Sequence, residues 1–185
     1  MKKTNTLLWL TLLCLSTIVA GCKKDKKAEQ LPPATQTGAN TFGCLINGVV
    51  YTPKGFKLNK PNFEMIVDPG FNDGNLDIRV YRLENEREIY LSLGSDSIKN
   101  VGFYPLDRNT GFYFLIATKG ITSLICEVLH AVGSNPVGKT GFIKITRYDL
   151  ANRVISGEFE FEFTNPDCGL GNPIKISQGR FDKSF

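Results

Sequence analysis

The chain has 185 residues and a formal net charge of +4. Lys2 and Lys3 supply two of these charges, and residues 23–40 supply the other two, because four lysines there oppose only Asp25 and Glu29. Residues 41–185 are therefore close to neutral. This argues against a nucleic-acid-binding protein, since such proteins need a basic patch on their folded part.

The first 21 residues have the composition of a secretion signal. Lys2 and Lys3 form a positive start, and residues 7–20 form an apolar run that is shorter than the roughly 20 residues of a membrane-spanning helix. The run ends in Val19-Ala20-Gly21-Cys22, which resembles the bacterial lipobox. We expect residues 1–21 to be removed and Cys22 to carry two or three acyl chains, which would anchor the protein permanently in a membrane. A plain secreted protein is the alternative.

Residues 22–40 are expected to form the lipidated cysteine and a flexible, disordered tether. They contain no large apolar side chain except Leu31, and they are rich in lysine, glutamine, threonine and proline. Such a segment does not bury enough surface to offset its ordering entropy. The lysines are expected either near anionic lipid head groups or simply in solvent.

Residues 41–185 have the length of one domain and a β pattern almost throughout. Asn47-Gly48 between two apolar runs is a strong hairpin signal, and Asp96 to Asn100 is expected to form a turn or a short helix. The pattern predicts a single all-β domain, an antiparallel β-sandwich or a barrel-like fold. The expected strands lie in 42–51, 63–67, 76–81, 88–93, 111–118, 123–129, 142–148, 154–163 and 174–181.

The stretch ISGEFEFEF at 155–163 shows the clearest alternation. Its aromatic residues share one parity and its glutamates share the other, so a strand buries the aromatics and exposes the carboxylates. If residues 142–148 form a hairpin with this strand, Ile143 must pair with Phe159 and Lys144 with Glu158, so that both apolar sets face the core. The glutamates are therefore interpreted as a solvated face rather than a catalytic or metal-binding array.

Three segments resemble the markers of a family of uncharacterised lipoproteins from Bacteroidota. They are TGANTFGCLINGVVYTP at 37–53, ISGEFEF at 155–161 and KISQGRFD at 175–182. The likeness covers both ends of the mature chain, whereas residues 54–140 carry no such marker. It implies an exported all-β domain behind a lipidated tether, and it implies no activity and no catalytic residues.

The same resemblance bears on localisation in the cell envelope. Surface display in that phylum often goes with an acidic cluster after the lipidated cysteine, but residues 23–27 read KKDKK, which favours the periplasmic side of a membrane. Asp96-Ser97-Ile98 fits the short O-glycosylation pattern of that phylum and makes Ser97 a candidate site. A chance match is the alternative, because the pattern has only three positions.

Three cysteines remain once Cys14 leaves with the signal and Cys22 is acylated. An oxidising compartment favours one disulfide and one remaining thiol, and the sequence leaves the pairing open. We favour Cys44 with Cys168, because both flank the family-like segments, and we expect Cys126 to be buried and free.

Residues 133–140 read GSNPVGKT and match the phosphate-binding pattern GxxxxGK[ST]. That pattern requires a helix at its end, whereas the residues that follow, GFIKITRY, have a β pattern. An exported protein also meets essentially no ATP. We therefore interpret the match as a surface loop before a strand and expect no nucleotide.

The stretch DPGFNDGNLD at 68–77 collects oxygen-bearing side chains. Oxygen ligands at alternate positions are typical of calcium sites, but residues 72–75 are equally good turn formers, and Ile78 stands where the EF-hand pattern requires glycine. We predict a turn. The calcium alternative would use Asp68, Asp73, Asn75 and Asp77.

His130 is the only histidine and is expected at the end of a strand, where it is a poor basis for a Ser-His-Asp arrangement. We predict no cofactor, and a non-catalytic module that binds a protein, a glycan or an apolar ligand, or serves structurally. An exported hydrolase with an unrecognised active site is the alternative. The only tryptophan, Trp9, lies in the signal, so sugar stacking would rely on Tyr81, Tyr90, Tyr104 and Tyr113.

Overall fold

The computed structural model describes residues 28–55, 61–84, 87–107, 109, 112–119, 124–130, 133, 138–164 and 172–185. These residues form eleven strands and no helix. No helix in this part of the chain is therefore long and apolar enough to cross a membrane.

The strands form two antiparallel sheets. Sheet A has the order β2-β1-β11-β10-β9-β6, and sheet B has the order β3-β4-β5-β7-β8. The bounds in sheet A are β1 Thr41–Ile46, β2 Val49–Tyr51, β6 Gly102–Pro105, β9 Lys139–Asp149, β10 Val154–Phe163 and β11 Ile174–Ser184. Those in sheet B are β3 Phe63–Asp68, β4 Asn75–Glu84, β5 Arg87–Asp96, β7 Phe112–Lys119 and β8 Leu124–His130.

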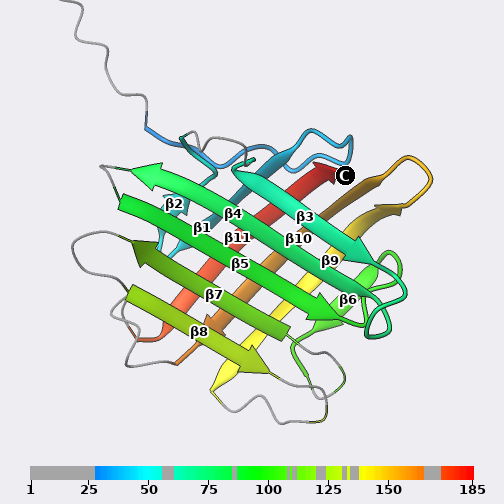
Figure 1. Cartoon of the computed structure of the whole chain (residues 1–185). Coiled ribbons are helices and arrows are strands. Elements are labelled where there is room, and N and C mark those ends of the chain that lie inside the picture. The colour runs from blue at the N-terminus through cyan, green and yellow to red at the C-terminus, as the bar shows by residue number, and fades with distance from the viewer. Residues whose placement is uncertain are drawn as a thin grey trace, which may run out of the picture.

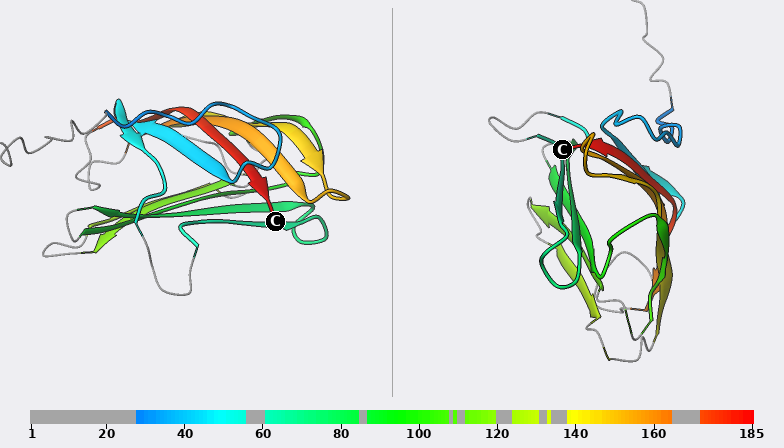
Figure 2. Two further views of the ribbon diagram at one scale, coloured as in Figure 1. Left: turned by 90° about the horizontal axis from the view of Figure 1, so that it is seen from above. Right: turned by 90° about the vertical axis from the view of Figure 1, so that its right-hand side faces the viewer.

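The two sheets pack face to face as a sandwich (Figures 1 and 2), and their strands run in crossing directions. Aromatic pairs join the inner faces: Phe42 of β1 and Phe63 of β3 have ring centroids 5.7 Å apart, and Phe161 of β10 and Phe112 of β7 have centroids 4.3 Å apart. The all-β prediction is confirmed, and of its two forms the structure adopts the sandwich.

The β9–β10 hairpin has the predicted register. Ile143 pairs with Phe159 and Lys144 with Glu158. Phe159, Phe161 and Phe163 are buried in the core, whereas the glutamates of β10 point outward. The parity assignment from the sequence is therefore confirmed, and the glutamate row is a solvated face.

Turn signals also located the connections correctly. Asn47 and Gly48 join β1 to β2, and both have positive φ angles of 48° and 81°, as expected for a tight hairpin turn. Residues 97–101 form a bend without a helix. The strand β6 was not predicted, because its four residues include Gly102 and Pro105 and follow no clear alternation.

Candidate functional site

Residues 28–40, which we call the strap, lie along the outer face of sheet A instead of extending into solvent (Figure 2). Leu31 and Pro32 cover Gly43 of β1 so closely that a Cβ at Gly43 would lie 2.6 Å from Pro32 Cδ. Farther along, Arg180 Nη1 donates to the Pro32 carbonyl at 3.2 Å and Arg147 Nη1 donates to the Gln36 carbonyl at 2.6 Å. The strap therefore crosses several strands of sheet A in succession.

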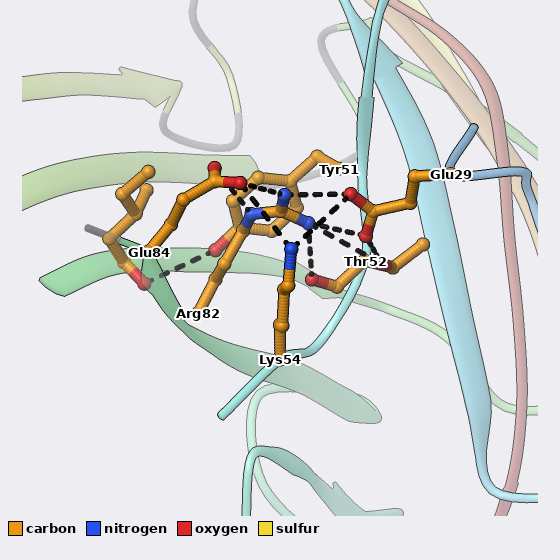
Figure 3. A network of polar contacts seen from close by, with 7 residues as sticks. Glu29, Tyr51, Thr52, Lys54, Arg82 and Glu84 are labelled. Atoms are coloured by element: carbon orange, nitrogen blue, oxygen red, sulfur yellow. Dashed lines mark hydrogen bonds and ion pairs between the residues drawn. The ribbon is translucent and has the colours of Figure 1, made fainter. Parts of the chain in front are cut away.

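The first attachment of the strap is a network of ion pairs around Arg82 (Figure 3). Arg82 shares the inward parity of Leu76, Ile78 and Val80 on β4, and it is only 4% exposed. Its Nη1 and Nη2 donate to the two carboxylate oxygens of Glu29 at 2.6 and 2.8 Å. This bidentate geometry is the strongest form of the arginine–carboxylate pair.

Further side chains complete the network. Nε and Nη2 of Arg82 also donate to Glu84, at 3.2 and 3.0 Å, and the Thr52 hydroxyl donates to Glu29. Lys54 Nζ lies 3.4 Å from a Glu84 oxygen and 3.9 Å from a Glu29 oxygen. Two cations thus face two carboxylates, so the charges of the network are balanced.

Electrostatics keep both carboxylates ionised. The hydrogen bonds from Arg82 lower the pKa of Glu29 to about 2, against a smaller opposing effect of burial. The same guanidinium lowers the pKa of Glu84, and Glu29 in turn raises the pKa of Arg82. The network links three parts of the chain, because Glu29 lies on the strap, Thr52 follows β2 of sheet A, and Arg82 lies on β4 of sheet B.

The second attachment is built around the carboxylate of Asp182 on β11. The backbone amides of Thr37, Gly38 and Ala39 donate to it at 2.9, 2.8 and 3.0 Å. The Thr35 hydroxyl donates at 2.6 Å, and the Ser156 hydroxyl of β10 donates at 2.7 Å. Asp182 and Ser156 point outward from sheet A, yet both are fully buried, because the strap covers them.

The cost of burying the Asp182 carboxylate is outweighed by these donors. Burial by itself raises the pKa of Asp182, but the hydrogen bonds from Thr35, Ser156, Ala39 and Thr37 hold it well below its usual range. A carboxylate with several amide donors stays ionised even when it is buried. Asp182 therefore fixes the strap through a charge that persists at all ordinary pH values.

The predicted disordered tether is thus wrong for residues 28–40, and residues 22–27 lie outside the described part of the chain. The prediction rested on the lack of large apolar side chains in this segment. Polar contacts hold the strap instead, to Arg82 on sheet B and to Asp182 on sheet A. The sequence contained one indication of such an attachment. Arg82 falls at a position of its strand that alternation assigns to the buried face, and a buried charge requires a partner. Glu29 and Asp182 carry no comparable signal.

The predicted lipidation and disulfide sites are only partly visible. Cys22 and Cys168 lie outside the described residues, as does the side chain of Cys126. Cys44 is a free thiol, fully buried in the core, and burial raises its pKa. The structure records Cys44 as a thiol and not in the disulfide that we expected with Cys168, which lies outside the described residues.

The calcium candidates are not gathered into one site. Asp68 accepts a hydrogen bond from the Gly70 amide at 2.9 Å, and Asp73 pairs with Lys99. Asn75 donates to Asp96 at 3.1 Å, whereas Asp77 pairs with Arg79 at 2.6 Å. Residues 69–74 form the turn between β3 and β4, as predicted, and no cluster of metal-ligating side chains occurs among the residues that the structure describes.

The remaining candidates keep the local structure expected of them. Lys139 and Thr140 begin β9 rather than a helix, and His130 is the last residue of β8. Ser97 is half-buried in the bend after β5, and its glycosylation stays a prediction.

No protein-family model, no curated protein and no solved structure matches the chain. The strap and its two attachments are therefore the features on which a functional interpretation depends.

Proposed function

We propose that the protein is a lipid-anchored, non-catalytic module of the bacterial cell envelope, held on the periplasmic side of a membrane by Cys22 and serving as a binding or structural unit. The lipobox-like segment Val19 to Cys22 supports the anchor. The strap supports the close attachment of the folded domain to that anchor.

The observation that carries the proposal is the short stretch of sequence between Cys22 and the first attached residue, Glu29. Only residues 23–28 separate the two positions. Seven residue steps span at most about 25 Å when fully extended. The attachments at Arg82 and Asp182 therefore keep the sandwich near the bilayer, where a free tether of residues 23–40 would let it range much farther.

The strap also presents the sandwich in a restricted orientation. Glu29 enters the network at Arg82, which lies near the end of β4, so this end of the sandwich lies within reach of the anchor. The lysines at positions 23, 24, 26 and 27 lie between Cys22 and Glu29 in the sequence, where they suit anionic head groups.

Membrane fractionation with palmitate labelling tests the anchor. Cys22→Ala is expected to abolish the label and release the protein from the membrane, because the thiol is the acylation site. Cys14→Ala is the matched control, since Cys14 leaves with the signal, and should retain both. Membrane retention of an unlabelled Cys22→Ala protein would refute the anchor.

Amide hydrogen exchange tests the close attachment. The amides of Thr37, Gly38 and Ala39 should exchange slowly in the wild type, because they donate to Asp182, and rapidly in Asp182→Asn. Equally rapid exchange in both proteins would show that the strap is a free tether.

A further inference from the structure

The outer face of sheet B carries three of the four tyrosines considered for sugar stacking. Residues such as Ile78 on β4, Leu93 on β5 and Phe114 on β7 point into the core, so the alternate positions point outward. Tyr81, Tyr90 and Tyr113 are among these, and each is half-buried. In Figure 1 this face is turned toward the viewer, and no described segment lies across it.

Tyr113 lies flat on the sheet above Gly94. The two residues are paired between β7 and β5, and a Cβ at Gly94 would lie 2.1 and 2.4 Å from Cε1 and Cζ of the tyrosine ring. Only glycine leaves room for the ring at this position. The ring therefore covers the strand with one face and offers the other to the outside.

A polar network fixes the ring. Burial raises the pKa of the Tyr113 hydroxyl, and its hydrogen bond with Asp77 adds to this effect, whereas a hydrogen bond with Ser92 opposes it. Arg79 Nη2 pairs with the Asp77 carboxylate at 2.6 Å, and the Ser92 hydroxyl lies 3.4 Å from it. Asp77 and Ser92 are each only 6% exposed, so their side chains are held in place by their neighbours.

The register places the other two tyrosines in line with this network. Tyr81 and Tyr90 pair directly across β4 and β5, and the Arg79–Ser92 pair lies between them and the Asp77–Gly94 pair. Tyr90 and Gly94 are four residues apart on one strand, which corresponds to about 13 Å. The tyrosine surface, formed by Tyr81, Tyr90 and Tyr113 with Asp77, Arg79 and Ser92, is therefore elongated along the strands.

We propose that the tyrosine surface binds a neutral glycan chain. Sugar rings have an apolar C–H face, which stacks on the electron-rich face of an aromatic ring, and hydroxyl edges, which pair with fixed donors and acceptors. Here the Tyr113 ring lies close to Arg79, whose side chain is 43% exposed and supplies donors for the hydroxyl edges. The charge of Arg79 is paired with the carboxylate of Asp77, and the length of the surface suits an oligosaccharide rather than a single sugar.

The proposal goes beyond the lipid anchor and does not depend on it, because the surface lies on sheet B and the strap lies on sheet A. A second copy of the chain or another protein is the competing occupant. The Tyr113 ring, held over Gly94, favours the glycan, and the experiment below separates the two.

Affinity electrophoresis of the full chain in a detergent without a sugar headgroup tests the proposal. Gels would contain laminarin, galactomannan or dextran as neutral probes, and polygalacturonate as the charged probe. We expect at least one neutral polysaccharide to retard the wild type. Tyr113→Ala and Tyr90→Ala should each weaken the apparent affinity at least about tenfold, which is 1.4 kcal/mol.

Two further variants keep the result interpretable. Phe103→Ala removes an aromatic side chain that is 61% exposed on the other sheet and should bind like the wild type. Gly94→Ala retains Tyr113 but displaces its ring, so it should bind as weakly as Tyr113→Ala. No retardation by any neutral probe, retardation by polygalacturonate alone, or equal binding by the tyrosine variants and the wild type would overturn the proposal. Self-association lost in Tyr113→Ala, without retardation, would assign the surface to a second copy.

Discussion

Arg82 is a buried cation whose main partner, Glu29, lies 53 residues away in the sequence. A buried charge without a partner is strongly destabilising, so the strap stabilises β4 as much as β4 holds the strap. Glu84 shares the guanidinium, but it lies on the same strand and contributes nothing to long-range attachment.

Replacing Arg82 with methionine is expected to lower the free energy of unfolding by about 2–3 kcal/mol, because charge-assisted hydrogen bonds contribute about 1.5–3 kcal/mol. Glu29 and Glu84 are partly exposed and regain water in the variant, which limits the loss. Urea denaturation measures the change. Lys144→Met is the control: it breaks an exposed pair with Glu158 and should change stability by less than about 1 kcal/mol. Equal losses in the two variants would contradict the role of Arg82.

Glu29 makes the stability of the domain dependent on pH. Its pKa falls from an ordinary 4.5 to about 2 in the folded protein. A lowered pKa stabilises the folded state above pH 4.5, and this contribution is lost as the pH falls from 4.5 toward 2.

The wild type should therefore be more stable than Glu29→Gln at pH 7, and the difference should shrink as the pH is lowered through that interval. Denaturant midpoints measured at several pH values follow the convergence. Glu162→Gln, which changes an exposed carboxylate of β10, is the matched control. A constant difference between wild type and Glu29→Gln would mean that the Arg82 pair does not lower this pKa.

The strand β10 shows how one element joins the core to a solvated face. Phe161 stacks on Phe112 of the opposite sheet and is 3% exposed, whereas its neighbour Glu162 is exposed. A shift of one residue in register would exchange the two faces, so the contrast between these side chains tests the strand directly.

Phe161→Ala is expected to lower the free energy of unfolding by about 3–5 kcal/mol, the usual loss for a truncated buried phenylalanine. Glu162→Ala should change it by no more than about 0.5 kcal/mol. Chemical denaturation of both variants gives the comparison, and similar midpoints would be incompatible with a half-buried strand.

At the scale of the whole molecule, the folded unit includes the strap as well as the eleven strands. Residues 28–40 supply Glu29 to Arg82 and three backbone donors to Asp182, so the stable unit extends N-terminally beyond the domain boundary predicted at residue 41. The strap lies on sheet A and leaves the outer face of sheet B uncovered, so the attachment to the lipid anchor and the proposed glycan-binding surface use opposite faces of the sandwich.

Deleting residues 28–40 should lower the free energy of unfolding by about 3–5 kcal/mol, since two sets of charge-assisted hydrogen bonds are lost. That is a large share of the roughly 5–15 kcal/mol that stabilises a domain. Deleting residues 23–27 is the control and should leave stability unchanged. Thermal or urea unfolding measures both, and a stable protein without residues 28–40 would show that the strap is an accessory segment.

The positions of most strands, the parity of β10 and the turns at Asn47-Gly48 and 69–74 could be predicted from the sequence, because they depend on neighbours within a few residues. Phe159 and Glu158 reveal their faces by alternation alone, and the Ile143–Phe159 pairing follows from the need to bury both apolar sets. The strap, the Arg82 network and the tyrosine surface could not be predicted in this way. Thr35 and Asp182 are 147 residues apart, and Tyr81, Tyr90 and Tyr113 share a face only because β5 lies between β4 and β7. Such contacts have no local period, so they exist only once distant segments of the chain have come together in the folded protein.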